Sequence, residues 1–176
     1  MTMDEIIDFT AGLDGVLTLR PAPGDGTPEI SWGDAFFYYA PDGTLPKTGQ
    51  PFATVVTKDY PGDTTSRLDR PGAYRVNIAA GKEELAHRTG HTPAPGADDT
   101  AGAAGAAGAD GTVGAVGAVG ADDSDDTVIA HPVYAAAGWL AVVNPAGRTA
   151  EDVRQLLCTA HRLARTRYER RARPGE

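Results

Sequence analysis

The sequence has little of what several classes of protein require. Cys158 is the only cysteine among 176 residues, which excludes an intrachain disulfide framework and a multi-cysteine zinc site. No apolar run reaches the roughly 18 residues that a membrane span needs. The N-terminus MTMDEIIDF lacks the basic and apolar regions of a signal peptide. We therefore expect a cytoplasmic protein that makes no use of a membrane.

Basic charge is also scarce, and its distribution is uneven. The formal net charge is −8, and residues 91–126 contain seven aspartates and no basic residue. Only residues 127–176 carry an excess of basic side chains, eight against four acidic ones. Because a protein that binds duplex nucleic acid usually has a basic balance, we expect nucleic acid to be an improbable partner.

Common catalytic and cofactor motifs are missing. Gly81-Lys82 would suit a phosphate-binding loop, but Val76 and Glu83 stand where that motif needs glycine and Ser or Thr. No Gly-x-Ser-x-Gly sequence is present. His87 and His91 are four residues apart, but Gly90 interrupts the helix face that a metal would need. We expect no cofactor and no metal site, and whether the protein is an enzyme stays open.

One segment is unusually regular. From Gly102 to Gly120, a glycine occupies every third position. Collagen has this period, but it also needs proline in the intervening positions, and none occurs between these glycines. The segment has few bulky apolar residues with which to offset the entropy of ordering. We interpret residues 91–126 as a flexible acidic insert within a single domain that spans residues 1–173.

The remaining chain alternates between strand and helix patterns. Thr2 and Glu5 form a capping box ahead of a helical repeat, and Thr149 and Asp152 are expected to do the same for the last helix. A further short helix is expected over 81–90. The expected extended segments are 16–20, 29–32, 35–43, 51–60, 73–79, 127–134 and 138–145, with Pro132 restricting 127–134 to an edge. This order predicts an α+β domain, an antiparallel meander of about five to six strands with N- and C-terminal helices on one face.

Several stretches together carry a family resemblance: SWGDAFFYYAPDG, PFATVVTKDYPGD, SRLDRPGAYRVNI, HPVYAAAGWLAVVNP and AHRLARTRYERR. They resemble a family of uncharacterised actinobacterial proteins, a domain of unknown function. A strand with Gly-Trp followed by a capped terminal helix is more distantly similar to the MmcQ/YjbR-like proteins, which are sometimes described as DNA-binding. Neither resemblance implies a role for any single residue.

The most informative candidate site lies in the strand AYRVNIA. Arg75 and Asn77 share one face of this strand, while Tyr74, Val76 and Ile78 occupy the other. We expect the apolar face to pack on the helices, which leaves Arg75 and Asn77 on an uncovered face or in a cleft. With His131 they would suit a small polar anion. The alternative is an internal salt bridge from Arg75 to Asp34, Asp59 or Asp69.

Three functions remain open. The first is a non-catalytic domain that binds a small molecule or a protein. The second is an enzyme of unfamiliar type that uses His131 with Asp34 or Asp59 as acid and base. The third is DNA binding through the arginine-rich last helix. Cys158, three residues before His161 on that helix, is interpreted as a thiol without a catalytic role. The catalytic residues, partner and oligomeric state are left open by the sequence.

Overall fold

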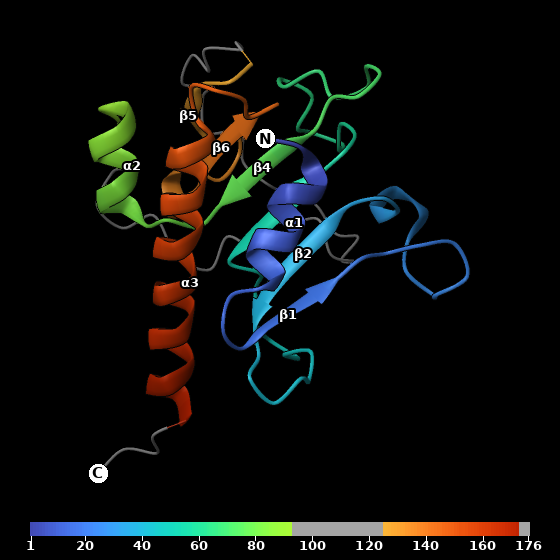
Figure 1. Cartoon of the computed structure of the whole chain (residues 1–176), viewed down its shortest axis with the longest axis vertical. Helices are drawn as coiled ribbons and strands as arrows, with labels where there is room; N and C mark the ends of the chain where they lie inside the picture. Colours follow the sequence, from blue (N-terminus) through green and yellow to red (C-terminus); the bar gives the residue numbers. More distant parts are fainter. Residues whose placement is uncertain (93–124, 173–176) are drawn as a thin grey trace.

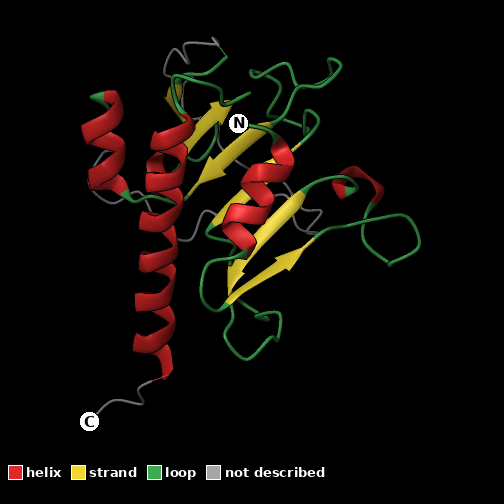
Figure 2. Ribbon diagram, viewed as in Figure 1, coloured by secondary structure: helices red, strands yellow, loops and turns green. Residues whose placement is uncertain are grey.

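Six strands form one antiparallel sheet in the computed structural model, which describes residues 1–92 and 125–172. Three α-helices accompany the sheet within these residues, and Figures 1 and 2 show α1 and α3 lying across the same side of it. The predicted α+β class is therefore confirmed. The strands are β1 (Val16–Leu19), β2 (Ala35–Tyr39), β3 (Ala53–Val56), β4 (Arg75–Ile78), β5 (Val128–Ala130) and β6 (Leu140–Val143). The helices are α1 (Met3–Ala11), α2 (Lys82–Thr89) and α3 (Ala150–Ala172).

The strand order is β1-β2-β3-β4-β6-β5, and every neighbouring pair is antiparallel. The first four strands follow one another as a meander. The chain then passes to the far edge for β5 and returns, so that β6 lies between β4 and β5. Pro132 follows this edge strand, as predicted, because a residue without an N–H cannot extend a central ladder. The segment 29–32 differs from its prediction, since Glu29–Ser31 forms a 3-10 turn rather than a hairpin strand.

The helix α1 begins as its sequence predicts. The Glu5 amide donates to the Thr2 hydroxyl at 3.2 Å, and the Thr2 amide donates to the Glu5 carboxylate at 2.7 Å. This reciprocal pair satisfies two amides that a helix leaves without a partner at its N-terminus. Ile6 and Ile7 are buried against the sheet. Local sequence chemistry therefore fixes both the start and the inward face of α1.

The helix α3 is capped differently from its prediction. The amide and the hydroxyl of Thr149 both donate to Asp126, at 3.0 and 2.6 Å. Asp152 accepts from Arg88 of α2. The predicted Thr149–Asp152 box is wrong, because a carboxylate from elsewhere in the chain takes the donors at this helix end. Asp126 also accepts from the amides of Ala146 and Arg148, so it ties the strand β5 to the start of α3.

We call the side of the sheet that α1 and α3 cover the helix-covered face. Val76 and Ile78 of β4 lie on it, as predicted, together with Phe37 and Leu140 of neighbouring strands. The helix residues buried against it are Ile6, Ile7, Val153, Leu156, Leu157 and Ala160. All are fully apolar, so this face forms the main core.

The opposite side is the loop-covered face, and it corrects a prediction. Arg75 and Asn77 lie there, but only 2% and 4% of their surfaces are exposed. The connection from β3 to β4, residues 57–74, folds back over this face, and Leu68 packs against Val56 and Val143. The face is therefore buried rather than uncovered. Leu68, Ala73 and the half-buried Tyr60 of this connection supply the apolar side chains that pack on this face.

The predicted insert, residues 91–126, falls mostly on 93–124, outside the described residues. Its last two aspartates are described and bound to the domain. Asp125 accepts from Arg70 at 2.5 Å and from Asn144 at 2.8 Å, while Asp126 caps α3. In the described chain, none of the helices combines the length and apolar character needed to cross a bilayer.

Candidate functional site

Arg75, Asn77 and His131 converge, although they come from different parts of the chain. Nε of Arg75 donates to Oδ1 of Asn77 at 2.7 Å, and Nη2 lies 3.4 Å from Nε2 of His131. The Asn77 amide in turn donates to the hydroxyl of Thr54 on β3 at 3.0 Å. Strand alternation and register bring Arg75, Asn77 and Thr54 to one face, and the turn after β5 supplies His131.

The position beside Arg75 is occupied by a carboxylate of the same chain. Nη1 donates to Oδ1 of Asp63 at 3.0 Å, and Nη2 donates to its Oδ2. Nη1 also donates to the hydroxyl of Ser66 at 2.8 Å. The side chains of Arg75 and Asp63 are only 3% and 11% exposed. The fork that we predicted for a free anion therefore holds Asp63, and the predicted internal salt bridge forms with this residue instead of Asp34, Asp59 or Asp69.

His131 is buried as a neutral ring. Its Nδ1 accepts from the amides of Val133 and Tyr134, at 3.1 and 3.2 Å. In a neutral ring the proton then resides on Nε2, so the 3.4 Å approach of Nε2 to Nη2 of Arg75 joins two donors and is a contact rather than a hydrogen bond. Burial in the first place, and the positive charge of Arg75 in the second, hold the pKa of His131 well below its usual 6.5. The rings of Tyr134 and Trp139 pack against it, with centroids 4.9 and 6.3 Å away.

Asp34, one possible partner of His131 in an acid–base pair, is committed to a second network. It accepts from the amide and the hydroxyl of Thr57 at 2.8 and 2.9 Å, from Nζ of Lys58 at 3.3 Å, and from the hydroxyl of Tyr60. Burial, and then the adjacent Asp34, raise the pKa of Tyr60 far above its usual 10. These contacts tie the start of β2 to the start of the 57–74 loop.

Asp59, the other possible partner, stabilises that same loop. Its carboxylate accepts from the amide of Leu68 at 2.8 Å, and its own amide donates to Asp69 at 3.1 Å. The polar contacts recorded for the His131 ring lead to Arg75, Val133 and Tyr134. The structure thus brings together the three predicted binding residues, but it directs Asp34 and Asp59 to other partners.

Two of the hollows on the surface of the described chain are lined by residues of interest. The first, about 370 Å³, is in the 57–74 loop and is lined by Asp59, Arg67, Asp69 and Arg70. Its aspartates already accept amides of the loop itself. The second, about 460 Å³, lies between α1 and α3. We call this second hollow the α1–α3 groove; it is an open depression of the surface rather than an enclosed cavity.

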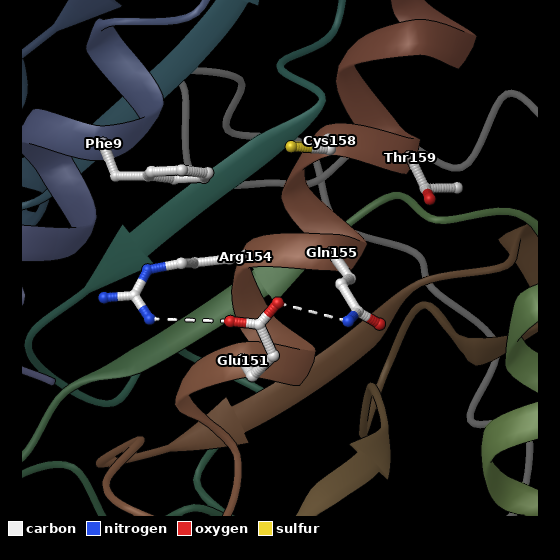
Figure 3. A pocket seen from close by; sticks show the side chains of 6 residues that line it. All are labelled: Phe9, Glu151, Arg154, Gln155, Cys158 and Thr159. Atoms are coloured by element: carbon white, nitrogen blue, oxygen red, sulfur yellow. Dashed lines mark hydrogen bonds and ion pairs between the residues drawn. The ribbon is translucent and has the colours of Figure 1, made fainter.

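The α1–α3 groove has an apolar floor and a polar end. Figure 3 shows the ring of Phe9 pointing from α1 toward Cys158 on α3, with Thr159 further along the helix. At the polar end, Glu151 accepts from Gln155 at 3.2 Å and lies 3.8 Å from a guanidinium nitrogen of Arg154. These three polar side chains lie together at this end of the groove, whereas Phe9 and Cys158 line the rest of it.

Cys158 has no catalytic partner on its own helix. The nearby His161 directs its Nε2 to the carbonyl of Asp14 at 2.7 Å, and its ring packs edge-on against Tyr39 and Phe52. The thiol is exposed and forms no disulfide. Over residues 1–92 and 125–172, no three His, Cys, Asp or Glu side chains gather closely enough to hold a metal ion.

Sequence reasoning missed Asp63, Ser66 and the α1–α3 groove. Asp63, which follows the strand expected over 51–60, was not among the carboxylates considered for Arg75, yet it is the partner of this arginine. One signal was available: in the predicted meander the strands at 51–60 and 73–79 are neighbours, so the chain between them has to return to the sheet. Phe9 carried no such signal, because its role depends on how two helices meet.

Residues 1–173 match a family of unknown function, DUF6194. The chain belongs to this family. The predicted membership of a domain-of-unknown-function family is thereby confirmed, and the match extends across both ends of the sheet and all three helices. Neither the curated proteins nor the solved structures contain a match.

Proposed function

We propose that the protein is a non-catalytic binding domain that receives an apolar group of its partner in the α1–α3 groove. The observation that carries the proposal is the mostly apolar lining of this groove, to which Phe9, Cys158 and the methyl group of Thr159 contribute. A small molecule and a protein side chain both fit this description. We also propose that the protein is cytoplasmic. Its actinobacterial origin and its likeness to the MmcQ/YjbR-like proteins stay predictions.

The internal commitments of the candidate acid–base residues support binding rather than catalysis. A general base needs a free lone pair within reach of a substrate proton. The Nδ1 lone pair of His131 already accepts two backbone amides. The carboxylate of Asp34 accepts from Thr57, Lys58 and Tyr60. Both groups therefore act as hydrogen-bond acceptors that stabilise the fold, which favours a binding domain over an enzyme.

The groove is suited to binding because it combines apolar area with a nearby charge. Phe9 is half-buried and packs on the main core, so its ring is held in place while one side faces the groove. A rigid ring of this kind contributes contact area at little cost in side-chain entropy. Arg154 at the polar end can add a charged contact to a partner that carries an acid group.

Cys158 supplies a direct test, because it is the only thiol of the chain. The rate of its alkylation by iodoacetamide reports access to the groove. Anilinonaphthalene sulfonate, an apolar dye with one acid group, serves as the probe. We expect the dye to slow the alkylation of the wild-type protein several-fold and to fluoresce on binding, because it lies over the thiol.

Two variants and a matched control complete the test. Phe9→Ala removes the floor, and Thr159→Lys fills the groove without removing core contacts; both should abolish the protection by the dye. Leu45→Ala removes an apolar side chain that is 46% exposed elsewhere, and it should leave the protection intact. Equal protection in all four proteins would contradict a site in the α1–α3 groove.

A further inference from the structure

The end of α3 extends away from the sheet. Ala160 is the last buried residue of this helix, and from Arg165 to Ala172 every residue except Tyr168 is exposed. Figure 1 shows this part of α3 continuing past β1 and β2 toward the C-terminus. The ring of Tyr168 rests edge-on against Tyr39, 5.4 Å between centroids, so the helix is supported up to its last turn. A stable helix therefore presents this segment to the surroundings.

The segment carries arginines that the described chain does not pair. Arg165 is paired with Glu169 at 2.8 Å. By contrast, Arg162, Arg167, Arg170 and Arg171 are exposed, and no ion pair or hydrogen bond of their side chains is found among the described residues. These four positive charges stand on a chain whose net charge is −8, so they form a local exception to its acidic character.

The spacing of these arginines is unfavourable for the isolated helix. Arg167 precedes Arg170 by three residues and Arg171 by four, and like charges at these spacings repel on a helix surface. The helix dipole attracts cations only within the last turn, which accounts for Arg170 and Arg171 but not for Arg162 or Arg167. The chain thus keeps a repulsive cluster that a bound anion would neutralise.

We infer that Arg167, Arg170 and Arg171, which share one side of the helix, form a docking surface for an acidic segment of a partner protein. Guanidinium groups fork onto carboxylates with two parallel hydrogen bonds, and a peptide rich in Asp or Glu can follow successive turns of the helix. A nucleic acid also carries anions, but its long charged backbone would meet the acidic remainder of the molecule. A short acidic peptide fits the small basic area better. This surface is independent of the α1–α3 groove, and failure of the dye test leaves it unaffected.

The test measures binding of a fluorescein-labelled polyglutamate peptide by anisotropy, using the full chain. Polyglutamine of the same length and a short DNA duplex are the comparison probes. The variant R167Q/R170Q/R171Q removes three charges from the surface. The matched control R20Q/K47Q/R148Q removes three exposed charges elsewhere, so that both variants have the same net charge.

We expect the wild-type protein and the control to bind polyglutamate equally, in a manner that weakens with salt. The R167Q/R170Q/R171Q variant should bind about tenfold more weakly, while its melting temperature is unchanged or higher because repulsion is removed. An equal loss in both variants, or no binding of polyglutamate by the wild-type protein, overturns the proposal. Tighter binding of the DNA duplex than of polyglutamate also overturns it, in favour of a nucleic-acid partner.

Discussion

The two faces of the sheet are buried by different physical means. On the helix-covered face, α1 and α3 bury apolar side chains of the sheet in one cluster. On the loop-covered face, the 57–74 loop buries a charged arginine, and it does so by supplying Asp63 and Ser66 as partners. Apolar burial is non-directional and accumulates with area, whereas a buried ion pair stabilises only while all its members are present. On the loop-covered face, removing one member of the network should therefore cause a large loss of unfolding free energy. On the helix-covered face, the loss should increase with the apolar area that is removed.

The largest expected effect comes from breaking the polar network of the loop-covered face. Asp63→Ala leaves the guanidinium of Arg75 buried without its carboxylate, and we expect the free energy of unfolding to fall by about 3–5 kcal/mol. Urea denaturation followed by circular dichroism measures this loss. Asp8→Ala, which removes an exposed carboxylate of α1, is the control and should stay within about 0.5 kcal/mol of the wild type.

The same network allows a sharper comparison. The double variant Asp63→Leu with Arg75→Met replaces the ion pair by apolar side chains, and such replacements are often neutral or stabilising. We expect it to recover most of the stability that Asp63→Ala loses. A double variant as unstable as the single one would show that the charges themselves hold the 57–74 loop in place.

On the helix-covered face, Leu156→Ala should cost about 2–5 kcal/mol through a cavity under α3. Leu156 is 1% exposed. Leu163, which the helical period predicts to be equally buried, is only half-buried because it lies where α3 leaves the sheet. Leu163→Ala is thus a matched control, and its loss should be clearly smaller. Equal losses at the two positions would mean that α3 stays packed against the sheet as far as Leu163, which is further than the structure shows.

A pH dependence should distinguish the two faces as well. The pKa of His131 is lowered by folding, so the unfolded chain binds more protons near and below pH 6.5. The stability that this neutral ring contributes is complete above the unfolded pKa and is lost as the pH falls below it, by at most about 1.4 kcal/mol per pH unit. Unfolding free energies at about pH 7.5 and about pH 5.5 measure the slope.

The control for this titration is His131→Asn. The amide oxygen of asparagine can accept the two backbone amides that Nδ1 accepts in the wild type, but it does not titrate. We expect the wild-type protein to lose more stability than this variant over the same pH interval. Parallel curves would indicate that the other histidines or the carboxylates account for the dependence.

The smallest effect concerns the connection between β5 and α3. Asp126→Ala removes the acceptor of four donors at the start of α3, and we expect a loss of about 1–2 kcal/mol, as for other N-terminal caps. Burial acts to raise the pKa of Asp126, but hydrogen bonds from Thr149 and neighbouring amides outweigh it and hold the pKa below its usual 3.8. Its contribution is therefore present above the unfolded pKa and is lost as the pH falls below it. Asp152→Ala, at the position of the box predicted from the sequence, should cost less than Asp126→Ala.

The sequence by itself determined the features that depend on near neighbours. The Thr2–Glu5 cap, the inward side of β4 and the edge position of β5 all follow from spacings of one to four residues and from the missing N–H of Pro132. These patterns predict the α+β class, and they place Arg75 and Asn77 on one face.

The tertiary structure alone decided which groups meet across long stretches of chain. Asp63 pairs with Arg75, Asp126 replaces Asp152 at the start of α3, and Phe9 faces Cys158 across the groove. The sequence contains many carboxylates that could satisfy each of these donors, and local propensity does not rank them. The choice belongs to the packing of the 57–74 loop and of α3 on the sheet, because burial excludes water and makes every donor take the nearest acceptor that the folded chain provides.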